Sequence, residues 1–178
     1  MHTGQIIFTI GALGLLSFAI LNLNTSINEN DVSLAQNRYR LEALSLMTSY
    51  IEQANMYFFD EASTDTSSAK ELKDFSLPNK LGFEANDIGE FDDFDDFNNY
   101  TKIDTGLSGV NYKVMFTVDY VKLQADTFAH SNAKEYNKRM TISITDAYSD
   151  PLLYRNFSGD KVRDTLKISF VNSYWFYN

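Results

Sequence analysis

The sequence predicts an α+β protein in which one long N-terminal helix packs on a small antiparallel β-sheet. Two patterns support this fold class. The chain opens with an uncharged apolar run at 6–21, which continues as an amphipathic stretch with helical spacing. Its C-terminal half contains segments near 111–122, 138–146 and 164–176 in which apolar and polar residues alternate. Such alternation is typical of an antiparallel sheet with one covered face.

The apolar run 6–21, IIFTIGALGLLSFAIL, decides how the start of the chain is interpreted. As a helix it would span about 24 Å, somewhat less than the ~30 Å hydrocarbon layer of a membrane. A cleaved secretory signal would need a basic start and a small-x-small cleavage site, and the sequence has neither. A removed signal, a permanent membrane anchor and a buried core helix are alternatives that composition leaves open. The residues around the run indicate a fourth.

Gly4 and Gln5 directly precede the apolar run, and helical spacing extends to about residue 58. This arrangement resembles the type IV pilin-like proteins, which include pilins and the pseudopilins of type II secretion. The resemblance implies that 1–4 is a leader, cut off after Gly4 by a prepilin peptidase. Gln5 would then be the new N-terminus, open to methylation, and 5–58 would be the family's long first helix.

The sequence departs from the family's pattern at three places. The leader MHTG has no Lys or Arg, Gln5 stands where Phe is usual, and Thr9 stands where the family has Glu. In the family that Glu pairs with the N-terminal amine of a neighbouring subunit, an ion pair strengthened by low dielectric. Thr9 offers a hydroxyl, which can instead bond back to its own helix. The departures favour a divergent, minor or tip-like subunit.

Charge is unevenly distributed along the 178 residues. The formal net charge is −9, and the segment 60–105 holds 13 acidic residues against four lysines. No basic stripe occurs that could displace the counterions of a nucleic acid, so we expect no nucleic-acid partner. The chain has no cysteine, which excludes disulfides and thiolate metal sites. The head, 59–178, is long enough for a modest core.

The second half of the predicted helix is amphipathic. Before it lies the polar stretch NLNTSINEND, which either belongs to the long helix or separates it from a new helix near Ser33, where Ser33 and Gln36 have the spacing of a capping box. The predicted core face consists of Leu41, Leu44, Met47, Ile51, Ala54 and Phe58. The predicted polar face consists of Arg38, Glu42, Ser45, Ser49 and Glu52.

The segment 84–99, EANDIGEFDDFDDFNN, is the most acidic part of the head. Its phenylalanines recur every third residue at 91, 94 and 97, which suits a short helix or 3₁₀ turn with its acids in solvent. A docking surface for a basic partner is compatible with that interpretation. Oxygen-rich loops also bind Ca²⁺, and some pseudopilins have a Ca²⁺ site in the loops of the head. The candidate ligands are Asp92, Asp93, Asp95 and Asp96, although their spacing is not that of an EF-hand.

Residues for catalysis are scarce. The histidines are His2, in the proposed leader, and His130, expected to be a surface residue. No glycine-rich phosphate loop, nucleophile elbow or zinc-binding helix motif occurs, so we predict that the chain is not an enzyme and needs no cofactor beyond the Ca²⁺ just considered. The aromatic tail 174–177 is expected to close the end of the core, with a binding groove as the alternative.

These patterns predict a structural subunit of a type IV pilus-like or type II secretion pseudopilus filament. The resemblance implies a single-pass protein of the bacterial inner membrane, its head outside the cytoplasm, which joins other pilin-like subunits in a periplasmic or cell-surface filament. Thr9, Gly11 and Gly14 are the candidate assembly residues, although the glycines are one residue too close for a G-x-x-x-G motif. The alternative is a single-pass, membrane-anchored binding or sensor domain that does not polymerise.

Overall fold

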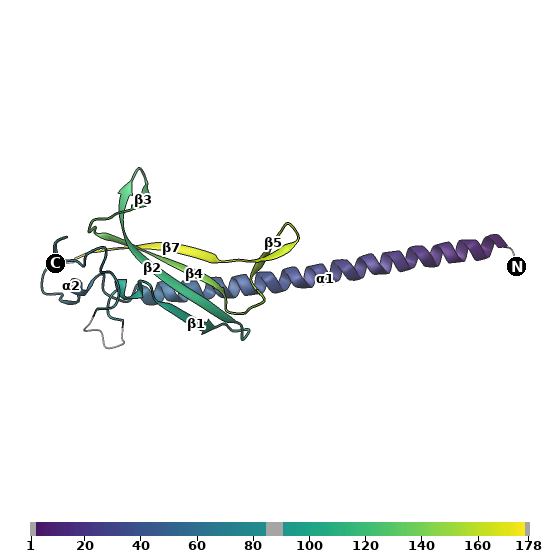
Figure 1. Cartoon of the computed structure of the whole chain (residues 1–178), viewed down its shortest axis with the longest axis horizontal. Helices are drawn as coiled ribbons and strands as arrows, with labels where there is room; N and C mark the ends of the chain where they lie inside the picture. The colour runs from purple at the N-terminus through teal and green to yellow at the C-terminus, as the bar shows by residue number, and fades with distance from the viewer. Residues whose placement is uncertain (1–2, 85–90, 177–178) are drawn as a thin grey trace. The chain divides into compact units, whose positions relative to one another are not determined.

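The computed structural model describes residues 3–84 and 91–176. The chain divides into a stem, residues up to 39, and a head, residues from 40 onward. Helix α1 (Thr3–Ala54) is continuous, and its last turns belong to the head (Figure 1). The polar stretch NLNTSINEND is therefore helical, and the alternative of a new helix near Ser33 is wrong. The helix ends four residues before the predicted limit at Phe58, since the backbone of Phe58 hydrogen-bonds to the acidic segment instead.

The head contains an antiparallel sheet in the order β1, β2, β4, β7 (Figure 1). These strands are β1 (Thr101–Thr105), β2 (Asn111–Gln124), β4 (Asn137–Asp146) and β7 (Leu166–Ser173). The predicted strands correspond to β2, β4 and β7, and the α+β prediction is confirmed at the level of one long helix and an antiparallel sheet. Strand β1, short and largely exposed, lacks the alternation that identified the others.

Short elements lie between α1 and β1 and in the connections between the strands. Strand β3 (Thr127–His130) folds back on the end of β2, and β5 (Tyr154–Phe157) pairs with β6 (Asp160–Arg163) in a separate hairpin. Helix α2 (Glu61–Thr64) lies where composition predicted a turn, and η1 (Asp95–Phe97) is the expected 3₁₀ turn. The side chains of Asp60 and Ser63 form a capping box that starts α2.

The last turns of α1 cover one face of the sheet through small side chains and one aromatic ring. The buried helix residues are Ala43, Met47, Tyr50 and Ala54. The Tyr50 ring meets the Phe116 ring edge-on at 5.0 Å, and the Tyr50 hydroxyl donates to Asp104 Oδ2 at 2.6 Å. The predicted face is therefore partly wrong, because Leu41 is 68% exposed and Leu44 43% exposed. The sheet supplies bulky aromatic residues, so the helix presents alanines where it packs against them.

Glu42, predicted to face solvent, is the clearest error on this helix. Its carboxylate accepts hydrogen bonds from Ser108 N at 2.5 Å, Ser108 Oγ at 2.5 Å and the Tyr112 hydroxyl at 2.8 Å. Tyr112 is fully buried, and this hydrogen bond satisfies its hydroxyl away from water. The carboxylate also occupies the space that a side chain at Gly106 would need. Glu42 thus joins α1 to the β1–β2 connection.

We expect Glu42→Ala to lower the free energy of unfolding of the head by about 1–3 kcal/mol, because it removes the carboxylate that accepts hydrogen bonds from Ser108 N, Ser108 Oγ and the Tyr112 hydroxyl. Glu42→Gln, which keeps one oxygen in place, should cost less. Urea denaturation of the full chain in detergent measures both. Glu52→Ala, on an exposed position of the same helix, is the matched control and should change stability by less than about 0.5 kcal/mol. Equal losses from Glu42→Ala and Glu52→Ala would contradict this role.

Candidate functional site

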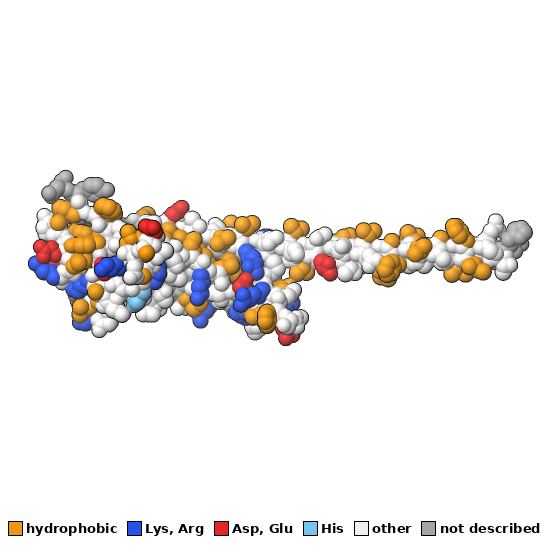
Figure 2. All heavy atoms as spheres, turned by 90° about the horizontal axis from the view of Figure 1, so that it is seen from above, with side chains coloured by type: hydrophobic (Ala, Val, Ile, Leu, Met, Phe, Trp, Pro, Cys, Tyr) orange, Lys and Arg blue, Asp and Glu red, His pale blue; other side chains and the backbone are white. Residues whose placement is uncertain are grey.

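The stem exposes apolar side chains on all sides of α1. All side chains from Thr3 to Leu34 are exposed, and no Asp, Glu, Lys or Arg occurs before Glu29. Figure 2 shows hydrophobic side chains at intervals along the stem, on the face in view. A helix that is apolar all round is normally covered by lipid or by other protein. This helix is long and apolar enough to cross a membrane.

The candidate assembly residues lie on this exposed helix. The Thr9 hydroxyl is within hydrogen-bond distance of Gln5 O at 2.8 Å and of Ile6 O at 2.9 Å, so its own helix satisfies it. Nothing lies within 4 Å of the position a Cβ would take at Gly11 or Gly14. These glycines therefore leave the backbone open to close approach by another helix.

The proposed processing site lies in the first turn of the same helix. Gly4 and Gln5 are both helical and exposed. Residues 1–2 of the proposed leader, including His2, lie outside the described residues. Cleavage after Gly4 stays a prediction.

The acidic segment is placed differently from the prediction. Asp92 is exposed, but Asp93, Asp95 and Asp96 are fully buried. The expectation of a solvated acidic face is wrong for these three residues. The physical reason is that Phe94, between Asp93 and Asp95, and Phe97, which follows Asp96, both enter the core. Residues 85–90 of the predicted acidic segment lie outside the described residues.

The backbone fixes this segment beside the end of α1. Phe94 N donates to Phe58 O at 2.8 Å, and Phe58 N donates to Asp92 O at 3.3 Å. These bonds form a parallel bridge between Phe58 and Asp93. Asp93, Asp95 and Asp96 are consequently held next to the chain that follows the helix, away from solvent.

Lys138, which sequence analysis did not single out, lies at the centre of the buried acids. It extends from β4 and is fully buried. Its ammonium donates to Phe59 O at 2.8 Å and to Asp60 Oδ2 at 2.8 Å, and it contacts Asp95 Oδ1 directly. It also lies 4.6 Å from the centre of the Phe59 ring. We call Lys138, Asp60, Asp93 and Asp95 the Lys138 cluster.

Asp60 connects the Lys138 cluster to the surrounding chain. Its carboxylate accepts hydrogen bonds from Ser76 N at 3.0 Å, from Ala62 N at 3.3 Å and from the Tyr120 hydroxyl at 3.3 Å. Burial, together with the negative charge of Asp60 and Asp95, raises the pKa of Tyr120 above its usual range. Tyr120 therefore remains a neutral hydrogen-bond donor in this cluster.

Burial gives the Asp93 carboxyl a strongly raised pKa. Its Oδ1 accepts hydrogen bonds from Asp95 N at 2.8 Å and Asp96 N at 3.2 Å. Burial, and then the negative charge of Asp95, raise the pKa of Asp93 to about 9, against the opposing effect of Lys138. Burial also raises the pKa of Asp95, and the Lys138 ammonium opposes this shift. At neutral pH the Lys138 cluster therefore contains a neutral carboxylic acid at Asp93.

The predicted Ca²⁺ ligands do not converge on a common point. Within 3–84 and 91–176, no three carboxylates or histidines are grouped as a metal ion requires. Asp92 is exposed, whereas Asp95 contacts the Lys138 ammonium and Asp93 accepts hydrogen bonds from backbone N–H groups. Calcium binding by Asp92, Asp93, Asp95 and Asp96 stays a prediction.

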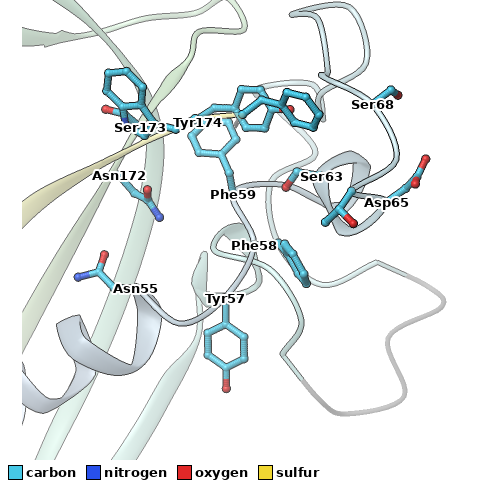
Figure 3. Close-up of a pocket in the computed structure, with 13 residues that line it drawn as sticks. Asn55, Tyr57, Phe58, Phe59, Ser63, Asp65, Ser68, Asn172, Ser173 and Tyr174 are labelled. Carbon is cyan, nitrogen blue, oxygen red and sulfur yellow. The ribbon is translucent and has the colours of Figure 1, made fainter. Parts of the chain in front are cut away.

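A pocket of about 290 Å³ opens beside the end of α1 (Figure 3). The Phe59 and Tyr174 rings lie 5.7 Å apart at this pocket, and Figure 3 shows the Tyr57 ring pointing away from them. Tyr174 also packs on Phe75, so the expectation that the tail closes the core is confirmed for Tyr174. It is wrong for Trp175, which lines the pocket and is 75% exposed.

His130 is an exposed residue at the end of β3, as predicted. Its Nδ1 lies 2.9 Å from Asp119 Oδ2, and its Nε2 lies 3.0 Å from Asn132 Oδ1. The hydrogen bonds to Asp119 and Asn132 raise the pKa of His130. These contacts order the turn after β3.

The raised pKa of Asp93 predicts that the head loses stability as pH rises. An unfolded aspartate ionises near pH 4, whereas the folded Asp93 ionises near pH 9. Between those values the unfolded state releases a proton that the folded state keeps, so stability falls by up to about 1.4 kcal/mol per pH unit. Asp93→Asn, which retains an oxygen for the backbone N–H groups, should flatten this slope and be the more stable protein at pH 8.

Urea midpoints at pH 5 and pH 8 measure this effect. Asp92→Asn is the matched control, because Asp92 is the exposed neighbour of Asp93, and it should leave the slope unchanged. An identical slope in the wild type and Asp93→Asn would show that Asp93 is not the group that titrates.

No protein-family model, no curated protein and no solved structure matches this chain. Functional assignment therefore rests on the stem and on the sites of the head.

Proposed function

We propose that this chain is a structural subunit of a pilin-like filament, of the type IV pilus or type II secretion pseudopilus kind. In this proposal it is cut after Gly4, held in the bacterial inner membrane by its stem, and assembled with other subunits through that stem. The observation that carries the proposal is the continuity of α1, which is apolar and exposed in the stem and packed on an antiparallel sheet in the head.

The cost of exposing the apolar stem to water supports this function. Each Å² of apolar surface left in water costs roughly 25 cal/mol, so the stem needs a permanent cover. Lipid supplies that cover before assembly, and the stems of neighbouring subunits supply it in a filament. Between lipid and filament the hydrophobic gain is small, and helix packing decides the balance. Small residues on the stem are then the contacts that matter most.

The polar side chain at Thr9 bears on the position that this subunit would take in a filament. The Thr9 side chain is uncharged, so it cannot form an ion pair with a neighbour's N-terminal amine. Its hydroxyl bonds to its own helix instead. Assembly would depend on close packing at Gly11 and Gly14, whose backbone is open. A minor or tip-like position, with fewer identical neighbours, fits this lack of an ionic contact.

The second candidate function is a membrane-anchored binding or sensor domain that does not polymerise. The pocket beside Tyr174 favours it, because Trp175 is largely exposed there and the Phe58 side chain also lines the opening. Exposed aromatic side chains at a concave surface are typical of recognition sites. A simple anchor would tolerate any apolar stem of equal length, whereas a filament subunit would not.

Processing is tested at the N-terminus. We expect protein from membranes of its native host to begin at Gln5, and Gly4→Ala to retain Met1 while remaining in the membrane. Mass spectrometry of the N-terminal peptide measures both. A wild-type chain that begins at Met1 would reduce the stem to an anchor, and one that begins beyond Leu21 would make the run a removed signal.

Assembly is tested at the stem glycines. Gly11→Leu should strongly reduce the amount of protein in the filament fraction, because a large side chain prevents close approach, while leaving the membrane-bound amount unchanged. Immunoblots of the sheared filament and membrane fractions measure this. Leu13→Ile, a volume-conserving change on the same helix, is the control and should assemble normally. Normal assembly of Gly11→Leu would favour the anchored binding domain.

A further inference from the structure

We infer that Lys138 and Asp95 become joined by an intramolecular amide bond between Lys138 Nζ and Asp95 Cγ. The two side chains come from distant parts of the chain, β4 and η1, and meet in direct contact inside the head. Both are fully buried. The inference concerns the head alone and does not depend on the proposed filament function.

The surroundings of the pair favour condensation. The Phe59 and Tyr120 rings lie 4.6 Å and 5.4 Å from Lys138 Nζ, so the nitrogen is held against aromatic faces. Phe94, fully buried, precedes Asp95 directly. Water is excluded from such a site, and an amide formed there is protected from hydrolysis. Holding the reacting groups in contact replaces an encounter between free molecules and is worth effective concentrations of up to about 10⁵–10⁸ M.

The hydrogen bonds distinguish Asp95 from Asp60 as the reacting acid. Asp60 uses both carboxylate oxygens, which accept hydrogen bonds from Ser76 N and Ala62 N among others. Asp95 Oδ2 receives no N–H or O–H donor from the part of the chain that the structure describes. Asp95 therefore has an oxygen that can depart without breaking a hydrogen bond to the backbone.

The reaction balances without an oxidant or any further reactant. Lys138 transfers a proton from its ammonium to the Asp95 carboxylate, which gives a neutral amine and a carboxylic acid. The amine lone pair attacks Asp95 Cγ and forms the C–N bond. The C–O bond of the acid's hydroxyl then breaks, and the hydroxyl leaves with a second proton from Nζ. The products are a secondary amide and one water molecule.

A neighbouring acid is placed to move these protons. Asp60 Oδ2, 2.8 Å from Lys138 Nζ, can accept the proton that the nitrogen loses during attack. Passing that proton on to the departing oxygen completes the water molecule and leaves Asp60 as a carboxylate, so no acid is consumed.

The cost of burying two charges also favours formation of the amide. Two opposite charges without solvent cost several kcal/mol each, which their mutual attraction repays only in part. Forming the amide removes both charges of this pair. Asp60 loses the ammonium that it contacts, but its carboxylate keeps the hydrogen bonds from Ser76 N, Ala62 N and the Tyr120 hydroxyl. The bond would also fix η1 to β4, segments that otherwise meet through side chains alone.

Peptide mapping of the full-length wild-type protein tests the inference directly. Trypsin should release peptide 81–102 joined to 135–139, because a modified Lys138 is no longer cut, and the joined product should be lighter than the sum of the two by one water molecule. We expect this product to replace the separate peptides almost completely. Recovery of peptides 81–102 and 135–138 as separate, unmodified species from the folded protein would overturn the inference, whatever any variant does.

Two variants and a control identify the bonded atoms. Asp95→Asn should lose ammonia instead of water and so yield the same joined product as the wild type. Lys138→Arg should yield separate peptides, since a guanidinium does not form this amide. Lys113→Arg, at an exposed lysine of β2, should leave the joined product unchanged. A joined product that persists in Lys138→Arg would assign the bond to another residue and overturn the assignment made here.

Discussion

The head depends on how the buried nitrogen of Lys138 is accommodated. As an ammonium, before the inferred amide forms, it would be prohibitively costly without partners, so segments around it present acceptors. Phe59 supplies a carbonyl, Asp60 and Asp95 supply carboxylates, and together they bring the chain after α1 and the η1 turn against β4. Asp60 in turn caps α2. A cluster of charges thus adds to the apolar contacts of these elements, in which the Phe59 and Phe97 rings are also buried.

The stem differs from the head because it contains no charged side chain before Glu29. Its polar groups are satisfied internally, as at Thr9, and its apolar surface is left for an environment outside the chain. Stability in the head comes from internal contacts such as those of Glu42 and Tyr50, whereas the stem gains its stability from whatever covers it. One helix, α1, serves both purposes because its composition changes near its middle.

Sequence patterns predicted the elements whose structure depends on residues close together in the chain. Alternation predicted β2, β4 and β7, and the apolar run predicted the stem. The Lys138 cluster escaped prediction because local composition makes an acidic run look solvated, while its partner lies 43 residues from Asp95. A signal was nevertheless present, since Lys138 is in phase with Met140 and Ile142 on the buried face of β4. Glu42 was missed because its partners Ser108 and Tyr112 lie 66 and 70 residues away, and Ser108 belongs to a connection without any pattern.

The Lys138 cluster also determines how the end of α1 is held. Glu42 and Tyr50 fasten the helix to the β1–β2 region, but beyond Ala54 the chain relies on the bridge at Phe58 and on Asp60. An amide between Lys138 and Asp95 would not include α1 in the covalent ring, since that ring contains only residues between Asp95 and Lys138. It would instead make η1 a fixed part of the sheet. The Phe58 bridge to the acidic segment would then connect the helix end to a covalently closed unit, so a force on α1 would break these hydrogen bonds before it could separate η1 from β4.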